Sequence, residues 1–195
     1  MWRFLLSALF LLVFGIGAMS SGQVTDSKHK PGRPDFTGTW KFDASRSKLD
    51  DLLAEMVRTS KAYELKIVIE QDWPVIKITQ SSYFDTSNLK EPFPAEAVTV
   101  DSLYADGRGE NDPIDTEVSR HQTVAKIVDN KLVLLLFTLD DYNKKTLAAT
   151  VEYSLAEDGN TLIRKFDAVL SNKKSLEDKT KPVFDALMVF TRSKK

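Results

Sequence analysis

The stretch at residues 36–40, Phe-Thr-Gly-Thr-Trp, is the feature that most constrains the fold of this chain. It places a glycine and a tryptophan at the start of a strand, directly after a polar stretch. Near the other end, residues 189–192 (Val-Phe-Thr-Arg) supply a strand-borne arginine, Arg192, that can pack across Trp40. The two together predict a sheet whose first and last strands meet. A closed sheet of roughly eight to ten strands either fills its middle with side chains or holds one small ligand there.

Most of the remaining sequence alternates between apolar and polar residues, which is the pattern of half-buried β-strands. Turn residues separate the alternating segments. Asp-Gly at 106–107 predicts a hairpin, and Asp-Asn at 129–130 and Asp-Gly-Asn at 158–160 predict tight turns. The pattern predicts strands at about residues 38–42, 63–69, 76–80, 97–105, 117–128, 132–139, 147–155, 161–170 and 187–192.

This spacing predicts an all-β fold, an antiparallel up-and-down meander β-barrel of roughly 8–10 strands. A short helix after the first strand interrupts the pattern. Apolar residues recur at helical spacing between residues 47 and about 59, and Ser47 followed by Asp50 has the form of a capping signal. At the rim of a barrel such a helix is either a lid over the interior or a plug that seals the open end. The alternative fold is a β-sandwich, which would leave Trp40 and Arg192 apart.

The first 20 residues predict a signal peptide. Arg3 precedes an apolar run at residues 4–16, and Ala-Met-Ser at 18–20 fits the pattern that signal peptidase cleaves. The alternative is an uncleaved membrane anchor, but a spanning helix needs about 20 apolar residues. We therefore expect a secreted or periplasmic protein without a stable membrane span after cleavage. Residues 21–34 are expected to be a disordered linker, and residues 35–195 a single barrel domain.

Composition and motifs argue against several classes of partner and site. The chain has no cysteine, so it forms neither disulfides nor thiolate metal sites. Its net charge is −1, without a basic stripe, so nucleic acid is not expected as a partner. The two histidines, His29 and His121, lie in unrelated segments without metal-ligand spacing, and no nucleophile-elbow motif is present. We therefore predict no enzyme, no cofactor and no metal site.

The motif at residues 35–43, Asp-Phe-Thr-Gly-Thr-Trp-Lys-Phe-Asp, resembles the opening of lipocalin-like (calycin) domains. It looks most like the exported bacterial type, which typically reads D-F-x-G-T-W-K-L-D-P-x-K-S. Ser-Arg-Ser at 45–47 matches the end of that motif, whereas Ala44 departs from its proline. Residues 106–107, 129–133, 155–162 and 189–192 also resemble that group. The resemblance implies that Trp40 and Arg192 pack together at the closed end, in a contact that contributes on the order of 1 kcal/mol.

The strand alternation also predicts which side chains line the interior. An aromatic-rich apolar lumen would suit a small hydrophobic or amphipathic ligand that one or two polar groups fix in place. Alternation puts Gln80 and Ser82 on the inward face, together with Arg164. A buried arginine is costly unless it is paired, so Arg164 either meets an acidic head group or lies near the rim, where its head reaches water. The predicted ligand-binding residues are Tyr63, Ile67, Ile78, Gln80, Tyr104, Tyr153, Arg164 and Phe166, and Trp40, Val100 and Val151 are also expected to face inward.

Three functions follow from this architecture. The leading hypothesis is an exported lipocalin-like barrel that binds a small lipophilic molecule in its lumen. The alternative is a filled, ligand-free barrel that acts as a protein-interaction or envelope-associated module, which predicts a contiguous exposed apolar patch. A barrel-mouth enzyme is the third, and it requires convergent polar groups with perturbed pKa values in one pocket.

Overall fold

The computed structural model of this chain describes residues 33–59, 63–85, 96–110, 114–115, 120–139, 144–168 and 184–193. The predicted signal peptide, residues 21–32 of the predicted linker and His29 lie outside these ranges. Within them, no helix is long and apolar enough to cross a membrane. Export and signal cleavage stay predictions.

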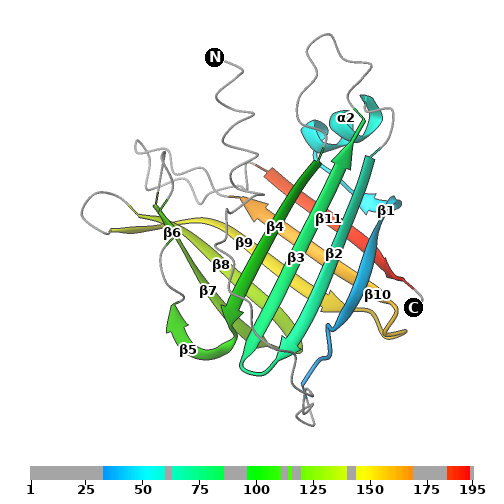
Figure 1. Cartoon of the computed structure of the whole chain (residues 1–195). Coiled ribbons are helices and arrows are strands. Elements are labelled where there is room, and N and C mark those ends of the chain that lie inside the picture. The colour runs from blue at the N-terminus through cyan, green and yellow to red at the C-terminus, as the bar shows by residue number, and fades with distance from the viewer. Residues whose placement is uncertain are drawn as a thin grey trace.

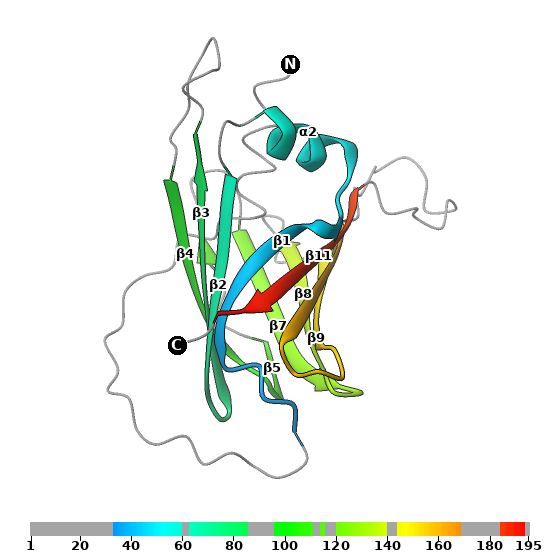
Figure 2. The same cartoon turned by 90° about the vertical axis from the view of Figure 1, so that its right-hand side faces the viewer.

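Antiparallel strands form one sheet that curves round into a nearly closed barrel (Figures 1 and 2). In chain order the elements are β1 (Gly38–Lys48), α2 (Asp51–Thr59), β2 (Tyr63–Asp72), β3 (Val75–Phe84), β4 (Glu96–Tyr104), β5 (Asp106–Glu110), β6 (Ile114–Asp115), β7 (Arg120–Val128), β8 (Lys131–Leu139), β9 (Lys145–Leu155), β10 (Thr161–Ala168) and β11 (Phe184–Arg192). The spatial order is β4-β3-β2-β1-β11-β10-β9-β8-β7-β5, and β6 pairs with β7. The predicted all-β meander barrel is confirmed.

The first and last strands meet, as the opening motif predicted. Strand β1 pairs with β2 on one side and with β11 on the other, both antiparallel. In the β1–β11 ladder Trp40 lies opposite Arg192. The β-sandwich alternative is therefore wrong, because it requires these two residues to be apart. The sheet order ends at β4 and β5, so the barrel is nearly closed rather than fully hydrogen-bonded around its circumference.

The helix after the first strand is present, but it begins later than predicted. It spans Asp51–Thr59, at the end of the barrel where β2 starts (Figures 1 and 2). Ser47 is not its cap, because Ser47 belongs to β1. The Ser47 hydroxyl donates to the Asp43 carbonyl at 2.7 Å and accepts from the Val189 amide at 2.8 Å. Its hydrogen bonds thus join β1 to β11 in a stretch where the ladder register shifts.

The Asp-Gly pair at 106–107 was wrongly predicted to turn a hairpin. These two residues begin β5, which pairs with β7 and not with the preceding β4. The predicted turn at Asp129 and Asn130 is confirmed, since both residues have left-handed φ angles, 48° and 60°. Left-handed φ at both central positions is the signature of the tight hairpin turn that matches strand twist. Strands β5 and β6 are the two that the sequence pattern did not predict.

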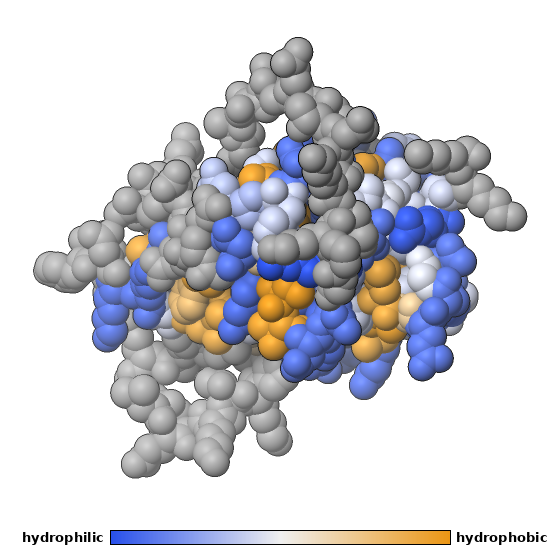
Figure 3. Space-filling model, turned by 90° about the horizontal axis from the view of Figure 1, so that it is seen from below, coloured by the Kyte–Doolittle hydropathy of each residue, from blue (hydrophilic) through white to orange (hydrophobic). Residues whose placement is uncertain are grey.

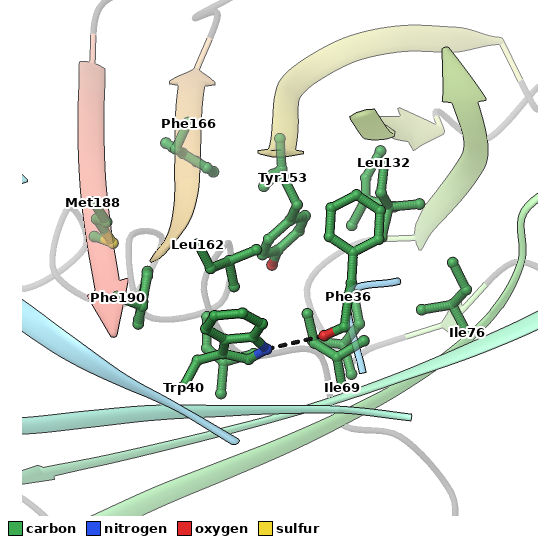
Figure 4. Close-up of a cluster of buried hydrophobic side chains, with 14 of the residues drawn as sticks. Phe36, Trp40, Ile69, Ile76, Leu132, Tyr153, Leu162, Phe166, Met188 and Phe190 are labelled. Atoms are coloured by element: carbon green, nitrogen blue, oxygen red, sulfur yellow. Dashed lines mark hydrogen bonds between the residues drawn. The ribbon is translucent and has the colours of Figure 1, made fainter. Parts of the chain in front are cut away.

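Fully buried apolar side chains fill the end of the barrel opposite α2, which we call the floor (Figure 4). The indole Nε1 of Trp40 donates to the Phe36 carbonyl at 3.0 Å, which ties the start of the domain to β1. The Arg33 guanidinium stacks on the Trp73 ring at 3.6 Å, so the chain before Phe36 packs along the β2–β3 turn. From this end, apolar residues reach the surface between polar ones (Figure 3). The floor residues are Phe36, Trp40, Ile69, Ile76, Leu132, Leu162 and Phe190.

Candidate functional site

Arg164 lies inside the barrel, one strand step above the floor. It sits on β10 between the inward-facing Leu162 and Phe166, and only 7% of it is exposed. Its Nη1 donates to Gln80 Oε1 at 3.3 Å and contacts Met188 Sδ at 3.7 Å. Gln80 is on β3, which is not a neighbour of β10 in the sheet, so the Arg164–Gln80 bond crosses the interior. Of the two positions predicted for Arg164, the structure has the interior one and not the rim.

Aromatic rings flank this guanidinium. The Arg164 Cζ atom lies 5.9 Å from the ring centroid of Tyr153 and 5.8 Å from that of Phe166. Both rings are within the range in which a cation is attracted to a ring face. Figure 4 shows Tyr153, Phe166 and Met188 directed into the interior above Leu162 and Trp40. The arginine therefore lies in a layer with a polar side toward β3 and an aromatic side toward β9 and β10.

Asp101 is the acidic residue of the same layer, and the sequence did not predict it. It lies on β4 between Thr99 and Leu103, whose side chains are buried, so alternation turns it inward. Burial raises the pKa of the Asp101 carboxyl, and the charge of Arg164 acts in the opposite direction. A buried carboxyl with a raised pKa holds its proton to higher pH than an exposed one.

The two tyrosines that share this interior have raised pKa values for the same reason. Burial raises the pKa of Tyr63 to about 12, and Arg164 partly offsets that increase. Burial also raises the pKa of Tyr153, with Arg164 again acting against it. Both phenols therefore keep their protons at neutral pH and can donate hydrogen bonds. Together with Arg164 they make the interior rich in donors.

Two polar atoms of this interior have no hydrogen-bond partner in the described part of the chain. One is Arg164 Nε and the other is Ser82 Oγ. Ser82 is 3% exposed and lies two residues beyond Gln80 on β3, on the same inward face. An unmade hydrogen bond at a buried polar group costs about 1–3 kcal/mol. Such groups in a native structure call for a partner beyond the residues that the structure describes.

On β8 and at the start of β2, side chains are less buried toward the α2 end than at the floor. On β8, Leu132 is fully buried, Leu134 nearly so and Leu136 only partly. On β2, Ile69 is fully buried, whereas Tyr63, at the end near α2, is partly exposed. The interior is thus sealed by side chains at the floor and less completely covered at the other end by the residues that the structure describes.

Most of the predicted lumen residues do face inward, and two do not. Tyr104 is 43% exposed and Val100 is 37% exposed, both on the outer face of β4, so their assignment to the lumen was wrong. Strand β4 turns Thr99 and Asp101 inward instead, toward the polar layer around Arg164. The predicted residues found buried inside are Ile67, Ile78, Gln80, Val151, Tyr153, Arg164 and Phe166, with Tyr63 partly buried.

Arg192 differs from Arg164 in that backbone carbonyls satisfy it. Its Nη1 donates to the Thr37 carbonyl at 2.8 Å and its Nε to the Gly159 carbonyl at 3.2 Å. Its Cζ lies 4.3 Å from the Trp40 ring. Gly38 has a φ of 150°, and a Cβ there would come within 3.1 Å of Arg192 Nη1. These contacts give Arg192 and Trp40 a structural position at the β1–β11 seam.

The described residues give no support to a metal site or to catalysis by His121. Among the residues it describes, no group of three or more His, Asp or Glu side chains could hold a metal ion. His121 lies on β7, opposite Thr138 of β8, and burial lowers its pKa.

No family model and no curated protein matches this chain. Similar solved structures include a REP1-NXSQ fatty acid transporter, with a TM-score of 0.47 and 12% identity over 82% of this chain and 96% of that chain. Secretory abundant heat soluble protein 4 from Ramazzottius varieornatus matches with a TM-score of 0.46 and 9% identity over 86% and 100%. The fluorescent protein UnaG matches with a TM-score of 0.43 and 15% identity over 81% and 97%. The resemblance to exported bacterial lipocalin-like domains stays a prediction.

Proposed function

We propose that this protein binds a small amphipathic molecule with an anionic head group inside its barrel, and that Arg164 binds the head group. The observation that carries this proposal is that Arg164 is only 7% exposed and that its Nε has no partner among the described residues. A carboxylate is the acceptor that a guanidinium fork fits best. A bound anion would accept a hydrogen bond from Arg164 Nε, which has no partner among the described residues.

The surroundings of Arg164 support one orientation of such a ligand. Fully buried side chains, Trp40 and Leu162 among them, fill the floor beneath it. Interior side chains are less covered toward α2. The head group would therefore lie deep and the apolar tail would run toward the α2 end, along Phe166 and Val151. Whether α2 acts as a lid or a plug stays a prediction.

The proposal is tested by titrating the full-length protein with three ten-carbon ligands of different charge, namely decanoate, decanol and decylammonium. We expect decanoate to bind tightest, since a hydrogen bond to a charged group contributes about 1.5–3 kcal/mol, or roughly ten- to a hundredfold in Kd. Arg164→Met should abolish the preference of decanoate over decanol. Lys165→Met is the matched control, because it removes the neighbouring positive charge on the exposed face. Equal binding of decanoate and decanol to the unmodified protein would contradict the proposal.

We propose that the barrel works outside the cytoplasm, secreted or periplasmic. The support is the sequence of residues 1–20, with its single positive charge, apolar run and small-residue cleavage pattern. The test is the N-terminal sequence of protein recovered from the native host, which we expect to begin near Ser21. A retained N-terminus in the recovered protein would favour the anchor alternative.

The interaction-module alternative has one observation in its favour. Four large side chains are exposed on the outer face of β3 and β4, namely Tyr83, Val98, Val100 and Tyr104. Its test is Val98→Lys with Val100→Lys: a loss of function in cells with unchanged decanoate binding would favour that alternative over the ligand-binding proposal.

A further inference from the structure

Ser82 is an interior side chain that, like Arg164, has a polar atom without a partner among the described residues, and it lies one strand step from Gln80. Its Oγ is buried and has no hydrogen-bond partner in the described residues. It follows Gln80 by two residues on β3, so the two side chains share a face and are about 6.6–6.8 Å apart along the strand. Since Tyr63, just after α2, lies opposite Phe84 at the end of β3, Ser82 is on the α2 side of Gln80.

The neighbours of Ser82 limit what can satisfy it. In the sheet register its partners are Leu65 on β2 and Ala97 on β4, both apolar. A buried water needs two to four polar partners; the two side chains opposite Ser82 supply none, and the nearest inward polar side chains on β3 and β4, Gln80 and Thr99, lie one strand step toward the floor. A ligand oxygen needs only one, because the rest of the ligand fills the apolar surroundings. The surroundings of Ser82 thus suit an oxygen atom on an otherwise apolar chain.

We infer that the ligand carries a second oxygen, a hydroxyl or carbonyl group on its chain, which hydrogen-bonds Ser82 while its anionic head group lies at Arg164. This inference rests on the proposed function, because Arg164 fixes the head group and the floor directs the chain toward Ser82. A carbon–carbon bond of 1.52 Å advances an extended chain by roughly 1.3 Å. Gln80, whose side chain contacts Arg164, lies about 6.7 Å from Ser82 along β3, which corresponds to about five bonds of a ligand chain that runs along this strand and places the oxygen near the sixth carbon of a carboxylate ligand.

The class of ligand is accordingly an oxygenated acid, such as a hydroxy or keto fatty acid, rather than a plain one. Two isomers, 6-hydroxydecanoate and 10-hydroxydecanoate, have the same composition and charge and differ only in where the hydroxyl lies. We expect the full-length protein to bind the 6-hydroxy isomer roughly three- to tenfold more tightly, the effect of one net hydrogen bond. Plain decanoate serves as the reference for head-group binding.

Ser82→Ala is the decisive variant and Ser81→Ala is its matched control, because Ser81 is the next residue on β3 and faces the other way. Ser82→Ala should bring the ratio of the two Kd values to about one, whereas Ser81→Ala should leave it unchanged. Because Ser82 Oγ has no partner among the described residues, the variant should melt at the same temperature as the unmodified protein, which separates binding from folding. Equal affinity for the two isomers, or a 6-hydroxy preference that survives Ser82→Ala, would overturn the inference while decanoate binding stays intact. If decanoate itself does not bind, or binds equally to Arg164→Met, the proposed function fails and this inference fails with it.

Discussion

Replacing Arg164 by methionine should separate the function of this residue from any role in stability. Methionine keeps an unbranched chain of similar length and removes the charge. The structure gives Arg164 a hydrogen bond of 3.3 Å to Gln80 and a contact with the Met188 sulfur, while its Nε has no partner among the described residues. Its charge also acts on Tyr153 and Asp101. The charge is nevertheless buried, and a buried ion loses several kcal/mol of hydration. The described contacts thus compensate the charge of Arg164 only in part, because its Nε has no partner among them.

The magnitude follows from these opposing contributions. Arg164→Met relieves the lost hydration of the guanidinium, but it also removes the positive charge that opposes the raised pKa of Asp101. We expect the two to offset, which leaves the free energy of unfolding within about 1 kcal/mol of the original. Replacing both charges, in Arg164→Met with Asp101→Leu, removes the second contribution and should stabilise the protein by about 1–3 kcal/mol, as when apolar residues of similar volume replace charged groups in an interior.

The control is Arg192→Met at the β1–β11 seam. It removes two hydrogen bonds to backbone carbonyls and the contact with Trp40, so we expect a loss of roughly 2–4 kcal/mol. Urea unfolding followed by circular dichroism measures all three variants, and decanoate titration measures binding. Decanoate affinity should fall only where Arg164 is replaced. A loss of more than about 3 kcal/mol in Arg164→Met, with decanoate affinity unchanged, would show that Arg164 is a structural residue and refute the reasoning.

Four further outcomes are expected. Asp101 competes with an anionic ligand for Arg164, so decanoate should bind more tightly as the pH is lowered and the Asp101 carboxyl, whose pKa is raised, gains its proton. Asp101→Asn should bind decanoate tightly at every pH at which the ligand stays ionised, and a pH-independent Kd in the unmodified protein would contradict this. Because the folded-state pKa of Asp101 lies above its usual value, its contribution to stability is full below about pH 4 and is lost as pH rises through the raised pKa, so Asp101→Asn should flatten the dependence measured by urea unfolding. Gly38→Ala should lower the free energy of unfolding by about 1–3 kcal/mol, because of its φ of 150° and the close approach of Arg192. The loss should exceed that of Gly159→Ala, where φ is 64° and nothing lies within 4 Å. Equal losses on thermal unfolding would mean that the Arg192 contact is not important. Trp40→Ala should cost roughly 3–5 kcal/mol in the free energy of unfolding, as for other fully buried aromatic residues, and a neutral effect would show that the seam does not stabilise the barrel.

The residues that could be predicted from sequence are those whose strand has one apolar and one polar face. On β2 and β10, Ile67 and Phe166 alternate with charged residues, so the inward side follows directly from the pattern. Barrel closure was predictable because Gly38 and Trp40 at one end of the domain have a partner in Arg192 at the other. These features depend on local alternation and on two short motifs, which are visible in a single sequence.

Strand β4 shows why the rest could not be predicted. Its apolar residues Val98, Val100 and Tyr104 are exposed, and its polar residues Thr99 and Asp101 face inward. The usual pattern is inverted because this part of the interior is polar, which is a property of β3 and β10 and not of β4 itself. One signal was available: an inward Arg164 requires a nearby acceptor or opposite charge. Choosing Asp101 from among the many acidic residues of the chain still required the register between strands.

Arg192 and Arg164 lie in the same barrel but differ in how completely the described residues accept hydrogen bonds from their guanidinium groups. Arg192 gives its donors to two backbone carbonyls, although it is the less buried of the two. Arg164 is more deeply buried, where unmade bonds cost most, and yet its Nε has no acceptor in the described chain. Ser82, one step further along the interior, repeats the pattern. Stability alone would favour an apolar side chain at the position of Arg164; the proposed ligand, with an anionic head group at Arg164 and an oxygen at Ser82, would supply the partners that the described residues do not.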